Sequence, residues 1–92
     1  MSDSAFKALA DPTRREILRL LSERELTAGE IVEKFDISQP AISRHLAVLR
    51  QSGLVSARRS GQNVVYALDT TVFQDVVRLL MSLGRTGKES KR

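Results

Sequence analysis

The chain contains no cysteine, and this absence excludes disulfides, thiolate metal sites and cysteine nucleophiles. It also fits a reducing compartment. Aromatic residues make up only 4% of the sequence, whereas hydrophobic residues make up 41%. The core must therefore be built from leucine, isoleucine, valine and alanine.

Long apolar runs are absent as well. No stretch approaches the ~20 apolar residues that a membrane helix needs. Residues 1–9 lack the basic and apolar regions of a signal peptide. We therefore expect a cytoplasmic protein with no membrane insertion.

The residues that catalysis or a bound cofactor would need are scarce. The chain has one histidine, no glycine-rich phosphate loop and no pair of carboxylates in an apolar setting. Two carboxylates late in the chain, Asp69 and Asp75, cannot build a tetrahedral metal site without histidine or cysteine partners. The sequence predicts no enzyme, no cofactor and no metal site.

Positive charge is concentrated in the middle of the chain. The net charge is +4, and residues 36–68 carry four arginines against a single acidic residue, Asp36. A locally positive segment on a near-neutral scaffold is typical of a protein that binds a polyanion. An ordinary basic surface would give the same charge, so charge alone does not decide between the two.

Local signals mark where the helices begin. Asp11 is a helix N-cap followed by a proline at the first helical position. Thr27 and Glu30 form a capping box, and Ser38 caps the helix after it. These helices carry apolar residues at helical spacing, which predicts one inward face for each. In the helix capped by Ser38 we expect this face to be Ile42, Leu46 and Leu49, and Gly53 to end the helix as its C′ residue.

The third and fourth predicted helices form a helix-turn-helix. The segment Asp36-Ile37-Ser38 between them is too short for anything but a sharp turn, and we expect Ile37 to hold this corner in the core. The N-terminal half of the second helix carries small and polar outward residues, as a helix that enters the DNA major groove requires. The expected DNA contacts here are Ser38, Gln39, Pro40, Ser43, Arg44, His45 and Arg50.

Several of these residues have alternative roles. Ser43 and Arg44 could be solvated helix residues, and Gln39 could cap the helix. His45, the only histidine, could act as a pH switch. Its place beside the inward apolar stripe favours a packing or phosphate-contacting role.

Residues 54–59 and 64–68 are predicted to form a β-hairpin around the turn-rich segment 60–63. Arg58, Arg59 and Gln62 lie at its tip, where we expect them to contact phosphate or the minor groove. A solvated edge strand would carry the same arginines. The predicted fold class is mostly α with a small β-hairpin, a dimeric winged helix-turn-helix of order α-α-α-α-β-β-α.

The last predicted helix, capped by Asp69 or Thr70, has too much apolar surface for a helix with one wet face. A small domain gains stability by pairing with a second copy, although the helix could instead complete the monomer core. The expected homodimer interface is Phe6, Leu9, Val72, Phe73, Val76, Val77, Leu80 and Met81. The DNA-binding and dimerisation domain then spans residues 1–83, and the basic, polar segment 84–92 is expected to be a disordered tail.

Three segments resemble the ArsR-type family of winged-helix repressors: ALADPTRREILRLL (8–21), LTAGEIVEKFDISQPAISRHLAVLRQSGLV (26–55) and ARRSGQNVVYAL (57–68). The stretch SQPAISRHLAVLRQSGLV is the most specific part. In its length and its valine-rich last helix without metal ligands, the chain is most similar to the small SdpR-type autorepressors. The resemblance implies a homodimer built from the first and last helices, bound to an inverted-repeat operator in double-stranded DNA, often in its own promoter.

The chain departs from the metal-sensing members of that family. They carry cysteine pairs in the third helix or Asp/His and His/Glu ligands in the last one, and this chain has neither set. Release from DNA would then depend on an unidentified small-molecule or protein effector, or on concentration alone. Gln62 stands where relatives often have a basic residue, which weakens the expected contact between hairpin and phosphate.

Two other functions stay open from the sequence. A winged helix can dock on another protein, and it would then bind duplex DNA weakly and without sequence preference. An architectural DNA binder would bind in a salt-sensitive, non-specific way, and would more naturally carry a lysine-rich helix face than Gln39, Ser43 and Arg44. We expect a specific repressor that occludes polymerase.

Overall fold

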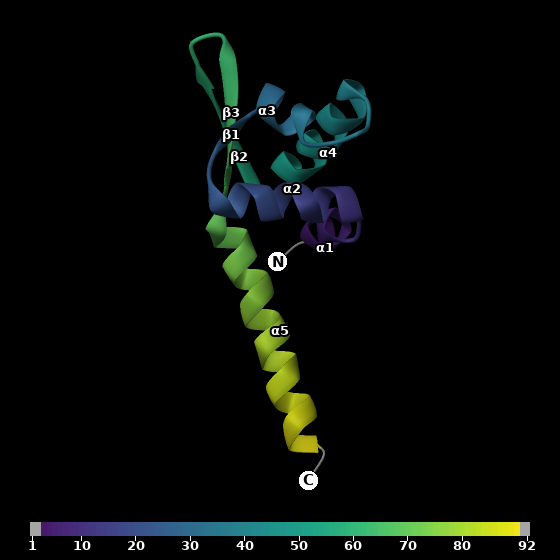
Figure 1. The fold of residues 1–92 in the computed structure, drawn as a ribbon. Helices are drawn as coiled ribbons and strands as arrows, with labels where there is room; N and C mark the ends of the chain where they lie inside the picture. The colour runs from purple at the N-terminus through teal and green to yellow at the C-terminus, as the bar shows by residue number, and fades with distance from the viewer. Residues whose placement is uncertain (1–2, 91–92) are drawn as a thin grey trace.

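The computed structural model describes the backbone of residues 3–90 and the side chains of residues 3–84. Its elements, in chain order, are α1 (Asp3–Leu9), α2 (Pro12–Glu23), β1 (Leu26–Thr27), α3 (Ala28–Glu33), α4 (Gln39–Gln51), β2 (Val55–Ser60), β3 (Asn63–Leu68) and α5 (Thr70–Ser90). The hairpin and α4 lie on one side of α2, and α5 extends away from the other side (Figure 1). The predicted mostly helical fold with a β-hairpin is confirmed.

The sheet has three strands, in the order β1-β3-β2, so the prediction of two strands is wrong in this respect. Leu26 pairs with Tyr66 and Thr27 with Val65, both antiparallel. A strand of two residues has no alternating pattern to detect, so the sequence does not predict β1. The hairpin of β2 and β3 closes at Gly61, whose φ of +63° is accessible to glycine without strain.

The predicted caps form as expected. The Asp11 carboxylate accepts a hydrogen bond from the Arg14 backbone N–H at 3.0 Å. The Thr27 hydroxyl accepts from the Glu30 N–H at 3.1 Å, and the Glu30 carboxylate accepts from the Thr27 N–H at 2.8 Å. The Ser38 hydroxyl accepts from the N–H three residues later at 3.3 Å. These bonds satisfy N–H groups that the helices leave unpaired at their first turns.

The end of α4 is a Schellman motif centred on Gly53, whose φ is +83°. The Leu54 N–H donates to the Leu49 carbonyl at 3.2 Å, and the Gly53 N–H donates to the Arg50 carbonyl at 3.1 Å. A Cβ at Gly53 would lie 2.9 Å from Cγ2 of Val72, so α5 packs closely against this turn. The motif therefore fixes where α4 stops and how the first turn of α5 approaches it.

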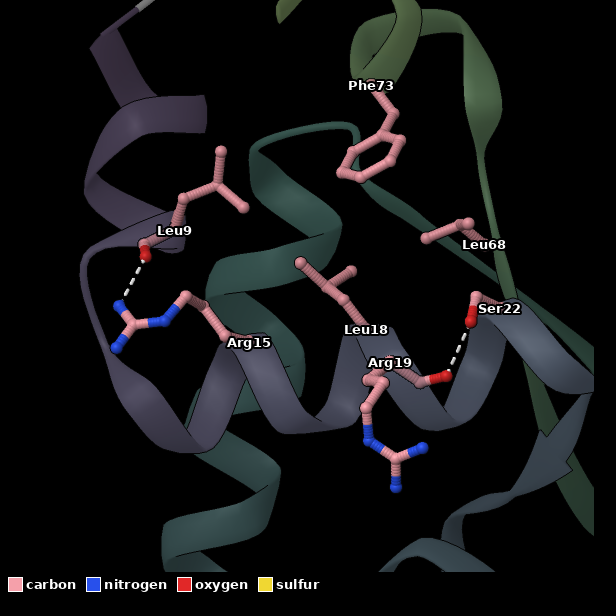
Figure 2. Close-up of a pocket in the computed structure, with 7 residues that line it drawn as sticks. All are labelled: Leu9, Arg15, Leu18, Arg19, Ser22, Leu68 and Phe73. Carbon is pink, nitrogen blue, oxygen red and sulfur yellow. Dashed lines mark hydrogen bonds between the residues drawn. The ribbon is translucent and has the colours of Figure 1, made fainter. Parts of the chain in front are cut away.

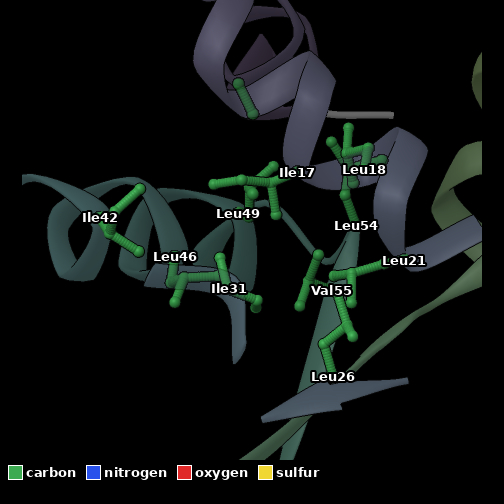
Figure 3. Packing of buried hydrophobic residues seen from close by; sticks show 11 residues of the cluster. Ile17, Leu18, Leu21, Leu26, Ile31, Ile42, Leu46, Leu49, Leu54 and Val55 are labelled. Carbon is green, nitrogen blue, oxygen red and sulfur yellow. The ribbon is translucent and has the colours of Figure 1, made fainter. Parts of the chain in front are cut away.

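The core lies where α2, α3, α4 and the start of β2 meet (Figure 3). The predicted inward stripe of α4, made of Ile42, Leu46 and Leu49, is buried. The expectation for Ile37 is wrong, because this side chain is 42% exposed. Ile31 and Ile42, which flank the turn in sequence, are fully buried and fill the core without it.

The last helix is longer than expected. Asp69 caps it by accepting a hydrogen bond from the Thr71 N–H at 3.0 Å. It then continues to Ser90, past Gly84, where we expected a disordered tail to begin. Extending a formed helix costs far less than nucleating one, so polar residues can follow the apolar part in the same helix. Residues 91–92 of the expected tail lie outside the described residues.

Candidate nucleic-acid interface

The outward face of α4 is exposed and polar. Its apolar residues are turned into the core, so the opposite face is left to solvent. The following residues, all expected to contact DNA, are exposed: Ser38, Gln39, Pro40, Ser43, Arg44 and Arg50. The exception among the expected contacts of this helix is His45, which is half-buried.

The two arginines on this face are available to bind a ligand. Among the described residues, Arg44 and Arg50 form no ion pair or side-chain hydrogen bond. A guanidinium without an internal partner keeps all five donors for phosphate oxygens or for the O6 and N7 atoms of guanine. Ser43, one residue before Arg44, adds a hydroxyl that can donate or accept.

The hairpin presents Arg58 and Arg59 differently. These residues are consecutive in β2, so their side chains leave opposite faces of the sheet. Arg58 donates to Oε1 of Glu25 at 2.9 Å, whereas Arg59 has no ion pair among the described residues. The Arg58 guanidinium holds the pKa of Glu25 below its usual range through that hydrogen bond and its charge. Gln62 lies exposed at the hairpin tip.

His45 belongs to a cluster that the sequence does not predict. Nη1 of Arg14 lies 3.2 Å from Nδ1 of His45. The same guanidinium donates from Nε to the Ala8 carbonyl and from Nη2 to the Lys7 carbonyl, both at 2.9 Å. Oδ2 of Asp11 lies 3.9 Å from Nδ1 of His45. Arg14 and His45 are 31 residues apart, so no local spacing could have paired them.

Asp11 is held as a carboxylate by the start of α2. The Arg14 backbone N–H donates to it and is the main reason that the pKa of this carboxyl is lowered. Burial raises the pKa and is the second-largest effect, whereas the charge of the Arg14 guanidinium lowers it further. The carboxylate therefore serves chiefly as the helix cap.

The expected dimer residues fall into three groups by their exposure. Phe6 and three residues of α5 are exposed in the single chain: Val77 by 41%, Leu80 by 56% and Met81 by 66%. Leu9, Val72 and Phe73 are half-buried and pack against the core. Val76 is only 3% exposed, so it offers no surface to a partner and its assignment to an interface is corrected.

A cavity of about 420 Å³ lies between α1, α2, β3 and α5 (Figure 2). Its walls are Leu9, Leu18, Leu68 and Phe73, with Arg15, Arg19 and Ser22 beside them. The three polar side chains are already engaged. Arg15 donates to the Leu9 carbonyl at 2.8 Å, Ser22 donates to the Arg19 carbonyl at 2.6 Å, and the Arg19 guanidinium pairs with Glu16 at 2.7 Å. The cavity therefore offers mainly apolar contact.

In the part of the chain that the structure describes, no cluster of three or more histidine, cysteine or acidic side chains could hold a metal ion. None of the described helices combines the length and apolar character needed to span a bilayer.

Comparison with known proteins gives consistent matches along the chain. A family model described as "Bacterial regulatory protein, arsR family" matches residues 11–57. The chain is 46% identical over 85 residues to the transcriptional repressor SdpR of Bacillus subtilis (strain 168), covering 92% of this chain and 94% of that protein. It is 42% identical over 78 residues to the transcriptional activator HlyU of Vibrio cholerae serotype O1, covering 85% and 72% respectively. Among solved structures, an ArsR-like transcriptional regulator from Rhodococcus sp. RHA1 matches with a TM-score of 0.86 at 30% identity, covering 95% of this chain and 80% of that one.

Proposed function

Because the chain belongs to the arsR family of bacterial regulatory proteins, we propose that it represses transcription as a homodimer bound to an inverted-repeat operator in double-stranded DNA. Family membership makes it a DNA-binding transcriptional regulator and not an enzyme. We propose in addition that the chain forms a dimer, that it binds an inverted-repeat operator through the residues named below, and that it is located in the cytoplasm. Repression occurs by occlusion, since a dimer seated on a promoter blocks the polymerase.

The single observation that carries the proposal is the division of α4 into a buried apolar stripe and an exposed polar face. Gln39, Ser43 and Arg44 lie on that exposed face, in the N-terminal half of the helix. In helix-turn-helix proteins this half meets the base edges in the major groove. We assign direct reading of a base to Arg44, because its guanidinium forms no ion pair or hydrogen bond with any described residue.

The hairpin supplies contacts that do not depend on sequence. Arg59 can contact a phosphate directly, whereas Arg58 must first break its ion pair with Glu25. An exposed ion pair contributes little to stability, so a phosphate can replace the carboxylate at small cost. Gln62 at the tip adds a neutral polar group near the backbone or minor groove.

The dimer follows from the apolar surface that one chain leaves exposed. Phe6 of α1 and Val77, Leu80 and Met81 of α5 are large apolar side chains in contact with water. A second copy would cover them, and two-fold symmetry would place the same patch on both sides. Two copies of α4 spaced ~34–36 Å apart would read successive major grooves on one side of the duplex.

An effector that releases the DNA stays a prediction, whether it is a small molecule or a protein. The apolar cavity beside Leu9 and Phe73 has a volume of about 420 Å³ and adjoins the proposed dimer surface. This volume falls within the range of small-molecule sites, roughly 300–1,000 Å³. An apolar small molecule is therefore the effector class that the cavity supports.

The experiment that tests the proposal compares binding of the purified protein to its own upstream DNA and to a scrambled duplex, at two salt concentrations. We expect preference for the native fragment, with two subunits per site, which would also indicate autoregulation. Equal, salt-sensitive binding to both duplexes would favour an architectural DNA binder. Absence of binding to either would favour a winged helix that docks on another protein.

A further inference from the structure

The side chain of Arg14 links three helices, and one of them is α4, the helix that we propose enters the major groove. It belongs to α2, donates to the Lys7 and Ala8 carbonyls at the end of α1, and reaches His45 of α4. Carbonyls at a helix end lack intrahelical donors, and the bond from Nε satisfies the Ala8 carbonyl. The Lys7 carbonyl accepts from the Ala10 N–H at 3.2 Å as well as from Nη2. Arg14 is therefore held by α1 through Nε and Nη2, and its third nitrogen, Nη1, lies 3.2 Å from Nδ1 of the imidazole.

This contact determines the tautomer of the neutral His45 ring. A guanidinium is always protonated and has no acceptor, so Nη1 must donate and Nδ1 must accept. Nδ1 therefore carries no proton, and the neutral ring has its proton on Nε2. Asp11 does not compete for Nδ1, because its carboxylate lies 3.9 Å away and already accepts from the Arg14 backbone N–H. Among the described residues, the charged groups that contact His45 are Arg14 of α2 and Asp11 at the N-cap of that helix.

The other ring nitrogen is left available. Nε2 has no partner among the described residues, and none of their buried side-chain nitrogens or oxygens lacks one. Nε2 therefore reaches solvent although the side chain as a whole is only 20% exposed. It lies on the far side of the ring from Arg14, and His45 directly follows Arg44 on α4.

We propose that Arg14 is a positioning residue for operator binding, which fixes the His45 ring so that Nε2–H donates to a DNA phosphate beside the base read by Arg44. The inference rests on the proposed function, because it assigns His45 a role in the operator complex. A neutral donor held rigidly in this way adds a phosphate contact without adding a positive charge. Arg14 itself touches no DNA.

The test measures operator affinity as a function of salt for the full chain and four variants: Arg14→Ala, His45→Ala, the double variant, and Arg15→Ala as a matched control. The operator is taken from a random-sequence pool by selection with the wild-type protein. Arg15 also donates to a carbonyl at the end of α1, that of Leu9, but has no contact with His45. Arg15→Ala therefore removes the same charge and a comparable cap while sparing the imidazole.

We expect Arg14→Ala and His45→Ala each to weaken operator binding roughly tenfold, the size of one well-made hydrogen bond. The double variant should bind no more weakly than His45→Ala alone, since both changes remove the same contact. The slope of log Kd against log salt should stay at the wild-type value, because no cation on phosphate is lost. Arg15→Ala should bind as the wild type does.

Three results would overturn the proposal. A salt slope reduced by ~0.9 in Arg14→Ala would mean that Arg14 meets phosphate directly. Additive losses in the double variant would mean that it does not act through His45, and equal losses in Arg14→Ala and Arg15→Ala would mean that only the α1 cap matters. If Arg14→Ala does not fold, Arg14→Lys keeps the charge but lacks the planar fork, and should show the same loss.

An ¹⁵N NMR spectrum of the imidazole in the free protein separates this inference from the proposed function. The chain has one histidine, so its signals are unambiguous. We expect the neutral ring to carry its proton on Nε2 and not on Nδ1, with the Nδ1 signal shifted in Arg14→Lys. A proton on Nδ1, or no shift in Arg14→Lys, would refute the pairing even if the operator is bound. Failure of the wild type to select any sequence would instead refute the proposed function and leave the NMR result standing.

Discussion

Arg44 and Arg58 lie on different elements and meet different partners in the free protein. Arg44 has no ion pair among the described residues, and Arg58 is paired with Glu25. A residue that reads a base changes affinity only for the sequences that contain this base. A residue that meets phosphate changes affinity for every sequence alike and changes the salt dependence.

Arg44→Ala is expected to weaken specific binding by ~1–3 kcal/mol and to relax specificity at one base position. Arg58→Ala is expected to weaken binding to all duplexes equally and to lower the salt slope by about one. Titrations against the operator and single-base variants, at several salt concentrations, measure both effects. Equal losses on all sequences for Arg44→Ala would show that it contacts only phosphate.

Contacts between residues that are far apart in the sequence could not be predicted from it. The exposed residues of α4 were predicted correctly as exposed, because helical periodicity assigns each to a face. The partners of Arg58 and His45 were missed, since Glu25 and Arg14 are 33 and 31 residues away along the chain. Only the packing of α2 and β1 against α4 and the hairpin brings these groups together.

At the scale of elements, local chemistry sets the helix boundaries. The caps at Asp11, Thr27 and Ser38 and the glycine after α4 all act within a few residues, which is why the sequence predicts them. β1 and Ile37 were missed for the opposite reason. A two-residue strand exists only because β3 pairs with it, and the exposure of Ile37 depends on how the core is filled elsewhere.

The capping box of α3 should make stability depend on acid pH. A hydrogen bond from the Thr27 backbone N–H is the main cause that lowers the pKa of Glu30 from its usual 4.5. Because the folded pKa is depressed, this contribution is present above the unfolded value and is lost as pH falls through the folded one. Glu30→Gln keeps an acceptor for the same N–H but does not titrate.

Urea unfolding at a series of pH values below 5 measures this contribution. The wild type should lose stability more steeply than Glu30→Gln as pH drops below the usual glutamate value. If the free energy of unfolding fell equally with pH in the two proteins, protonation of Glu30 would not be linked to unfolding.

Gly53→Ala tests how closely α5 packs on the end of α4. Alanine at positive φ costs ~1–2 kcal/mol, and the 2.9 Å approach of its Cβ to Val72 adds ~1–3 kcal/mol of overpacking. Gly61→Ala is the control, because Gly61 also has positive φ but its Cβ would meet nothing within 4 Å. Thermal and urea unfolding should rank Gly53→Ala well below Gly61→Ala, and equal losses would contradict the close packing.

At the scale of the whole molecule, α5 is the element whose apolar surface a single chain leaves exposed to water. The core cluster formed by the elements before α5 is buried, whereas Leu80 and Met81 stay more than half exposed. A charge placed on this face would have to be buried without a partner if a second copy covers it.

Leu80→Glu should therefore convert the dimer to a monomer and abolish tight operator binding. Gln74→Glu is the matched control, since it adds the same charge at an exposed polar position of α5. Sedimentation equilibrium of both variants gives the oligomeric state directly. A wild-type monomer, or a Leu80→Glu variant that stays dimeric, would contradict the assignment of this face.

The central claim is that two copies of α4 read one DNA site, and selection from a random-sequence duplex pool tests it most directly. We predict enriched sequences that contain an inverted repeat, with half-sites separated by about one helical turn, ~10–10.5 bp from centre to centre. That spacing follows from two symmetry-related helices in successive major grooves. Enrichment of a single, unrepeated half-site, or of no common sequence, would contradict the account.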